Sequence, residues 1–263
     1  MGTKGKILSV HSYRGGTGKS NLSANLAYQA VLRGKRVAVL DTDLQSPGVH
    51  MILGLPPERI TSTLSDYLFG KCELEEAAYN LSNDLDVGDN GGALYLLPSS
   101  MKVDAIVRIA SEGYDPGKLN DHFRPLMKDL NLDLLVLDTH PGLNKETMMS
   151  TAVSDGLLLV ARPDTQDFHG TAVLMEVANR LGVPRIYILA NKVPAALDRA
   201  GVRQRMEKAF GIEVLGMLPL AEELAVLGSR GLFTVEYPDH EATLELCGVV
   251  DRLLASLDGD ASP

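Results

Sequence analysis

Residues 12–20 of the chain, Ser-Tyr-Arg-Gly-Gly-Thr-Gly-Lys-Ser, have the composition of a phosphate-binding loop. Its glycines can take positive φ angles, so backbone N–H groups can face an anion at the start of a following helix. Lys19 then reaches the β- and γ-phosphates, and Ser20 places a hydroxyl on Mg²⁺. An apolar run at residues 6–11 precedes the loop and an amphipathic run follows it, which predicts a nucleoside triphosphate site between a strand and a helix. The predicted phosphate-binding residues are Gly15, Gly16, Thr17, Gly18, Lys19 and Ser20.

The loop departs from the simplest P-loop pattern, Gly-x-x-x-x-Gly-Lys-Ser/Thr, because Tyr13 stands where that pattern has its first glycine. It is similar to the deviant Walker A motif of the MinD/ParA-type P-loop ATPases of the SIMIBI class, Lys-Gly-Gly-x-Gly-Lys-Ser/Thr. Arg14 stands in place of the signature lysine, and Tyr13 in place of a small residue. In that family the lysine crosses a dimer interface to the partner's ATP. The resemblance makes Arg14 a candidate catalytic residue, which could act in this way or neutralise phosphate within its own subunit.

A second apolar run, residues 37–40, ends in Asp-Thr-Asp-Leu-Gln at residues 41–45. A buried parallel strand has this pattern, with its carboxylates at the end where α/β proteins bind ligands. The segment resembles switch I of ParA-like members. The resemblance implies that Asp43 orients the attacking water and that Asp41 supports the Mg²⁺ shell, although acidic residues at strand ends are also common helix caps. Ser-Pro-Gly at residues 46–48 predicts a stiff turn that moves as a unit when the γ-phosphate leaves.

A third apolar run, residues 132–137, precedes Asp138-Thr-His-Pro-Gly. Four apolar residues followed by an aspartate match a Walker B motif, so Asp138 is expected to hold Mg²⁺ directly or through water. The ending resembles switch II of the same family, in which Gly142 offers its N–H to the γ-phosphate. His140 could act as a general base, but a histidine in a turn before proline is more often a hydrogen-bonded spacer.

Further strands are expected at residues 156–161 and 185–190, each preceded by a helical stretch. The second of these ends at Asn191, which resembles the family's base-recognition asparagine and is also a favoured turn residue. Residues 216–220 resemble the strand and proline turn beside the adenine. Alternating strands and helices predict an α/β fold with a doubly wound, mostly parallel sheet flanked by helices, and the resemblance covers residues 5–257.

The chain has 263 residues, of which 45% are hydrophobic, and this predicts one P-loop ATPase domain over residues 1–257 with a short disordered tail at 258–263. No signal peptide or membrane-spanning run is recognised, so a cytoplasmic protein is expected. Cys72 and Cys247 stand apart in the sequence. Relatives that carry iron–sulfur clusters usually bridge a dimer with closely paired cysteines, which makes that role less favoured here but leaves open a symmetric single-cysteine site.

The resemblance suggests two surfaces on which such a protein could act, an anionic membrane and DNA. From residue 240 onward five acidic residues accompany a single arginine, so attraction of the C-terminal helix to an anionic membrane is not expected. The net charge of -9 also disfavours nucleic acid. A local basic cluster could nevertheless contact DNA phosphates without sequence specificity, or it could simply be solvated. The cluster consists of Arg199, Arg203, Arg205 and Lys208.

The resemblance therefore implies an ATP- and Mg²⁺-dependent molecular switch. Two subunits would sandwich ATP, expose a surface for a protein partner, and reset through hydrolysis that is slow without an activator. Such switches position or partition other complexes. Two alternatives stay open, a metallocofactor-maturation ATPase and a nucleotide-responsive scaffold with negligible hydrolysis. The expected catalytic residues are Lys19, Asp43 and Arg14; the expected metal ligands are Ser20, Asp138 and Asp41; and Asn191 and Gly142 complete the nucleotide contacts.

Overall fold

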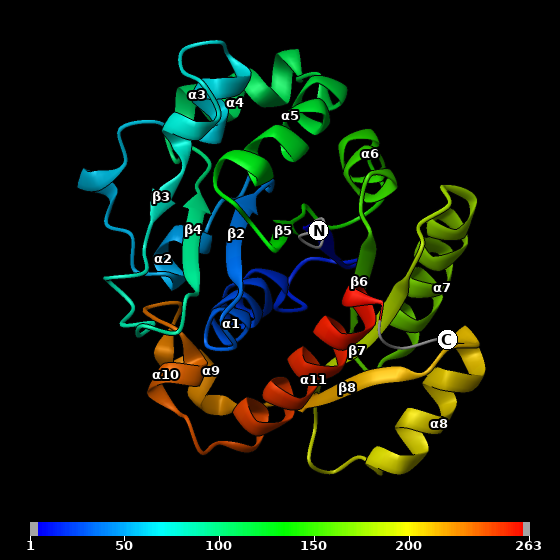
Figure 1. The fold of residues 1–263 in the computed structure, drawn as a ribbon. Helices are drawn as coiled ribbons and strands as arrows, with labels where there is room; N and C mark the ends of the chain where they lie inside the picture. Colours follow the sequence, from blue (N-terminus) through cyan, green and yellow to red (C-terminus); the bar gives the residue numbers. More distant parts are fainter. Residues whose placement is uncertain (1–4, 260–263) are drawn as a thin grey trace.

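The structure of the chain is a computed structural model that describes residues 5–259. Within these residues one sheet of eight strands has the order β3-β4-β2-β5-β1-β6-β7-β8 (Figure 1). The strands are β1 (Lys6–His11), β2 (Arg36–Asp41), β3 (Tyr79–Asn80), β4 (Ala93–Leu97), β5 (Leu134–Asp138), β6 (Gly156–Ala161), β7 (Ile186–Val193) and β8 (Val214–Pro219). Neighbouring strands are parallel except β3, which is antiparallel to β4. The predicted doubly wound, mostly parallel sheet is confirmed.

Helices cover both faces of the sheet. Figure 1 shows α1 and α11 together on one face, and α5, α6, α7 and α8 following one another on the other. The helices are α1 (Lys19–Val31), α2 (Val49–Ile52), α3 (Leu64–Leu68), α4 (Val103–Glu112), α5 (Pro116–Asp129), α6 (Lys145–Ala152), α7 (Thr165–Arg180), α8 (Arg199–Phe210), α9 (Glu222–Leu227), α10 (Phe233–Glu236) and α11 (Glu241–Asp258), with 3₁₀ turns η1 (Pro57–Arg59) and η2 (Glu75–Ala77).

The central strands are apolar throughout because successive side chains enter different cores. Leu8 and Val10 of β1 pack in the cluster beneath α1 and α11, whereas Ile7 packs on the opposite face with Phe123 of α5. A third cluster continues that opposite face beneath α7 and α8. A strand buried on both faces needs no polar alternation, which explains the continuous apolar runs in the sequence.

Most expected strands agree with the structure. β1 and β6 have the predicted bounds, and β5 begins two residues later than expected. β4 was not predicted. At the C-terminus α11 includes residue 258, which was expected to begin a disordered tail, and residues 260–263 of that tail lie outside the described residues. No helix within residues 5–259 combines the length and apolar character needed to cross a membrane.

The topology gathers the motifs at one edge. β1 lies between β5 and β6. The strands on one side of β1 are β5, β2, β4 and β3, and those on the other side are β6, β7 and β8, so the loop after β1 leaves the sheet at a topological switch point. Asp41 and Asp138 are register partners on β2 and β5, and Asp138 is also the register partner of Val10 on β1. The carboxyl ends of parallel strands at such a switch point form the usual ligand crevice of α/β folds.

Candidate nucleotide site

The P-loop between β1 and α1 takes backbone conformations that favour glycine. Gly16 has a φ of +76° and Gly18 a φ of +94°. A Cβ added at Gly18 would lie 2.7 Å from Asn191 Nδ2, which is too close for a non-bonded contact. Helix α1 begins directly at Lys19, so its first backbone N–H groups face the loop. This local geometry suits an anion at the helix N-terminus.

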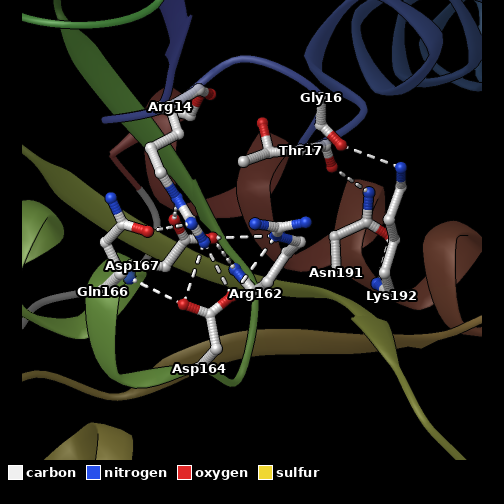
Figure 2. Close-up of polar contacts among 10 residues, drawn as sticks. Arg14, Gly16, Thr17, Arg162, Asp164, Gln166, Asp167, Asn191 and Lys192 are labelled. Carbon is white, nitrogen blue, oxygen red and sulfur yellow. Dashed lines mark hydrogen bonds and ion pairs between the residues drawn. The ribbon is translucent and has the colours of Figure 1, made fainter.

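Two residues at the end of β7 hold the P-loop from the side (Figure 2). Asn191 Nδ2 donates to the carbonyl of Thr17 at 2.8 Å, and Lys192 Nζ donates to the carbonyl of Gly16 at 2.8 Å. Asn191 Oδ1 accepts from the backbone N–H of Lys192 at 2.9 Å. Asn191 was expected to read the adenine edge. Its amide engages the protein through one N–H and one acceptor site, so base recognition would use the remaining N–H and lone pair and stays a prediction.

Lys19 and Asp138 form the charged centre of the site. Lys19 is only 6% exposed, and burial lowers its pKa, while Asp138 and Asp43 nearby act in the opposite direction. Asp138 is also buried, and burial raises its pKa to about 6 against the effects of Ser20, Lys19 and Ser23. Ser23 Oγ donates to Asp138 Oδ1 at 2.9 Å.

The second carboxylate oxygen, Asp138 Oδ2, is buried and has no hydrogen-bond partner among the residues that the structure describes. An unpaired buried acceptor is costly unless a ligand satisfies it. A carboxylate oxygen beside a serine hydroxyl is the donor set that Mg²⁺ prefers, so Asp138 and Ser20 fit the predicted metal.

Asp41 has a clear structural role. Its Oδ1 accepts from the N–H of Asp43 at 3.2 Å, and its Oδ2 accepts from Gly48 at 3.0 Å and Val49 at 3.3 Å. Burial and the neighbouring charge of Asp138 raise the pKa of Asp41, and the N–H groups of Gly48 and Val49 oppose that rise. Both oxygens therefore hold the turn after β2 and the start of α2, whose N-cap residue is Gly48. Participation in the Mg²⁺ shell stays a prediction.

Asp43 and switch II border the same cleft. Asp43 is half-buried, and its Oδ1 accepts from the N–H of Ser46 at 3.1 Å. Gly142 has a φ of +88°, and its N–H donates to the carbonyl of Ser12 at 3.0 Å. A contact between this N–H and a γ-phosphate would therefore require switch II to move. His140 Nδ1 lies 2.8 Å from the carbonyl of Pro141, an arrangement in keeping with a spacer.

The cleft has a volume of about 710 Å³ and continues from the phosphate loop toward α9 and α10. Charged and polar groups line one end, and Leu218, Pro219 and Phe233 line the other. A polar end joined to an apolar end suits a nucleotide with its phosphates on the P-loop and its base against β8. Lys19, Ser20, Asp43 and Asn191 all line it, so the structure brings these predicted residues together.

Arg14 points away from the loop toward the start of α7, where it forms ion pairs with Asp164 and Asp167 (Figure 2). These two acids and Lys192 were not among the residues predicted for the site. Asp164 could have been recognised from the sequence as a helix cap, because it is an aspartate between an apolar strand and a helix. In the structure it is the N-cap of α7, and its side chain accepts from the N–H of Asp167. Their pairing with Arg14 depends on β1 lying beside β6 and has no local signal.

Two arginines of the basic cluster on α8 form hydrogen bonds within the protein. Arg199 donates to Glu241 and to the carbonyl of Met217, and Arg203 donates to the carbonyl of Val214 at 2.6 Å. Arg205 and Lys208 are exposed. The two cysteines lie on separate elements, Cys72 before η2 and Cys247 on α11.

Comparison with known proteins gives the family. The CobQ/CobB/MinD/ParA nucleotide binding domain matches residues 8–235. The chain is 26% identical to the antiactivator FleN of Pseudomonas aeruginosa over 94% of this chain and 86% of that protein. It is 28% identical to the iron-sulfur cluster carrier protein of Methanocaldococcus jannaschii over 97% of this chain and 86% of that protein. The septum site-determining protein MinD of Pyrococcus horikoshii, complexed with Mg-ADP, superposes with a TM-score of 0.77 at 20% identity, covering 97% of this chain and 99% of MinD.

These matches agree with the family resemblance of the sequence and with the fold described above. The MinD structure shares the fold, and the domain match extends from β1 to α10. The chain therefore belongs to the CobQ/CobB/MinD/ParA nucleotide-binding family and is a MinD/ParA-type ATP-binding protein.

Proposed function

We propose that this protein is an ATP-driven molecular switch that binds Mg²⁺-ATP, dimerises, and resets by slow hydrolysis. The observation that carries the proposal is the meeting of Lys19, Asp43 and Asp138 beside a glycine loop at one strand edge. A lysine and a metal-binding carboxylate on the phosphates, with a second carboxylate within reach of a water molecule, are the components that phosphoryl transfer requires.

The residues have separate roles in this proposal. Lys19 and the N–H groups of the P-loop hold the phosphates, while Ser20 and Asp138 hold Mg²⁺. Bound Mg²⁺-ATP supplies the phosphoanhydride and a divalent charge that neutralises its oxygens. Asp43 orients the attacking water. A carboxylate is a weak base at neutral pH, so turnover by the protein alone is expected to be slow.

The two switch segments would report which nucleotide is bound. Gly142 must exchange its bond to Ser12 for one to a phosphate, and the turn after Asp43 would follow the γ-phosphate. The ATP state would then expose a surface that the ADP state lacks, and a protein partner would recognise that surface. The similarity to the antiactivator FleN supports a role in regulating another protein.

Steady-state phosphate release and sedimentation of the Asp43→Ala protein test the proposal. We expect Asp43→Ala to bind Mg²⁺-ATP with wild-type affinity, to release phosphate at least tenfold more slowly, and to accumulate as a dimer. The matched control is Asp89→Ala, which changes an exposed acid in the loop before β4. An Asp43→Ala protein that stays monomeric with ATP would count against the dimeric switch.

DNA is a second possible binding partner, because Arg205 and Lys208 are exposed on α8. Binding of the Asp43→Ala protein to DNA should be measured with Mg²⁺-ATP and with Mg²⁺-ADP across a salt series. Binding that requires ATP and weakens with salt would indicate a positioning system that runs on DNA. Absence of binding at low salt would leave a protein partner as the target.

Two alternatives retain specific support. The likeness to the iron-sulfur cluster carrier protein favours a metallocofactor-maturation ATPase, which metal analysis of Cys72→Ser and Cys247→Ser proteins tests. A nucleotide-responsive scaffold is favoured by the departures at Tyr13 and Arg14. Intact ATP binding without any phosphate release would support the scaffold.

A further inference from the structure

We propose that Tyr13 and Arg14 anchor the P-loop to α7 of their own subunit, that Asp167 is the positioning residue of this anchor, and that Arg14 does not act on a partner's nucleotide. The inference rests on the proposed ATPase function and assigns a role to the two positions that depart from the deviant Walker A motif. It is carried by a set of contacts between residues 12–14, the arm that leads into the P-loop, and the first turns of α7 (Figure 2).

The guanidinium of Arg14 is engaged on all three of its nitrogens. Nε donates to Asp167 Oδ1 at 2.5 Å, Nη2 donates to both oxygens of Asp164 at 2.9 and 2.7 Å, and Nη1 donates to Gln166 Oε1. A planar fork can satisfy three acceptors at fixed angles, which a single lysine ammonium cannot do in the same geometry. The arginine therefore suits the β6–α7 loop better than the family's lysine would.

Asp167 is the most buried acid of the cluster, with only 1% of the residue exposed. Besides Arg14 it accepts from the backbone N–H of Arg162 at 2.9 Å and from Arg162 Nε at 3.2 Å. Burial alone would raise the pKa of Asp167, but the bonds from Arg14 and Arg162 outweigh it and lower that pKa. If Arg14 left for a partner subunit, two carboxylates would share the single charge of Arg162, and one of them is buried.

Tyr13 makes the second contact between this arm and α7. A Cβ added at Gly170 would lie 2.1 Å from ring atoms of Tyr13, so the ring rests directly on the backbone of the helix. Ser12 Oγ also donates to the carbonyl of Arg14 at 2.7 Å, which fixes the turn between the two side chains. The arm that precedes the phosphate-binding glycines is thus held by packing, by ion pairs and by a hydrogen bond to its own backbone. We expect these contacts to keep the P-loop amides in position for phosphate.

Mixed dimers distinguish action within one subunit from action across the interface. Phosphate release would be measured for Arg14→Ala, for Asp43→Ala, and for an equimolar mixture of the two at saturating Mg²⁺-ATP. If Arg14 acted across the interface, a mixed dimer would hold one complete site, and random pairing would raise the turnover of the mixture above the mean of the two separate proteins by roughly a quarter of the wild-type value. We expect instead that the mixture gives only the mean of the two separate proteins.

The anchor also predicts how the single variants fail. Loss of P-loop order should raise the KM for ATP of Arg14→Ala about tenfold and change kcat less than about threefold. Asp167→Asn should reproduce this effect, and the double variant should be no worse than either single one. Arg180→Ala, an exposed arginine at the end of α7, is the matched control and should leave KM unchanged. If Asp167→Asn does not fold, Asp164→Asn tests the same pairing while keeping a residue that can cap α7.

The possible results separate the anchor from the proposed function. Turnover of the mixture above the mean of the two separate proteins, or an unchanged KM in Arg14→Ala, would overturn the anchor while leaving the ATPase intact. If the wild-type protein releases no phosphate, the proposed function fails. The anchor can then still be tested by titrating the wild type and Arg14→Ala with Mg²⁺-ATP, because the anchor predicts a lower ATP affinity in the variant. An unchanged ATP affinity in Arg14→Ala would reject the anchor.

Discussion

Acidification from pH 7.5 to 5.5 is expected to destabilise the protein through His11, at the end of β1. The ring is 2% exposed, and its Nδ1 lies 2.8 Å from Thr139 Oγ1, which donates to the carbonyl of Val10. Nε2 is buried and has no partner among residues 5–259. Burial, and next the charge of Lys19, lower the pKa of His11 to about 3. The ring is therefore neutral in the folded protein across the physiological range.

The magnitude follows from the difference between the folded and unfolded pKa values. An unfolded histidine titrates near pH 6.5 and binds a proton at pH 5.5, whereas folded His11 does not. Because its folded pKa is depressed, the stability linked to His11 is fully present above pH 6.5 and is lost as the pH falls. Between pH 7.5 and 5.5 the unfolded state gains about 1.4 kcal/mol from this group. Asp138, with a pKa raised to about 6, acts in the opposite direction over the same interval.

Urea unfolding at both pH values, for the wild type and for His11→Asn, isolates this contribution. Asparagine can keep a donor near Thr139 but has no group that titrates, and Asp138 is common to both proteins. We expect the free energy of unfolding to fall by about 1.4 kcal/mol less in His11→Asn than in the wild type over this interval. His169→Asn, which changes an exposed histidine on α7, is the control. Equal pH dependence in His11→Asn and the wild type would refute the buried neutral ring.

Three further predictions concern the nucleotide. Lys19→Ala should abolish ATP binding in calorimetry, and normal affinity would refute the P-loop assignment. Gly18→Ala combines a φ of +94° with a Cβ 2.7 Å from Asn191 Nδ2, so ATP affinity should fall at least about tenfold; Gly88→Ala, at φ +73° with no neighbour within 4 Å, should leave affinity unchanged. Asp138→Asn should raise the Mg²⁺ concentration needed for phosphate release at least about tenfold, and an unaltered Mg²⁺ dependence would remove this residue from the metal shell.

Much of the fold could be predicted because the central strands are apolar on both faces, and two of them, β2 and β5, end in an aspartate. β4 escaped prediction although Ala93–Leu97 is also apolar, because it follows a glycine-rich loop and has no motif at its end. The C-terminal helix continued beyond the expected boundary, since Leu257 is buried against the core while Asp258 reaches Lys35. Such boundaries depend on tertiary contacts that a single sequence does not display.

The residues of the site also differ in whether the sequence could identify them. Residues that chemistry requires at fixed spacing, such as Lys19 and Ser20, were identified from the motif. The partners of Asn191 and Arg14 were not, because they lie about 150 residues or more away along the chain. Asp41 shows the limit most clearly. One pattern was compatible with a metal ligand and with a helix cap, and only the structure reveals that its carboxylate accepts from the Gly48 and Val49 amides.

The contact between Tyr13 and Gly170 also restricts the order in which mutations can accumulate. The ring occupies the space that any side chain at position 170 would need, so the residue tolerated at position 170 depends on the residue at position 13. A lineage with a small residue at position 13 can tolerate alanine at position 170. In a lineage with the tyrosine, the glycine can be lost only after the ring has gone. Relatives that keep an aromatic residue at position 13 are therefore expected to carry glycine at position 170.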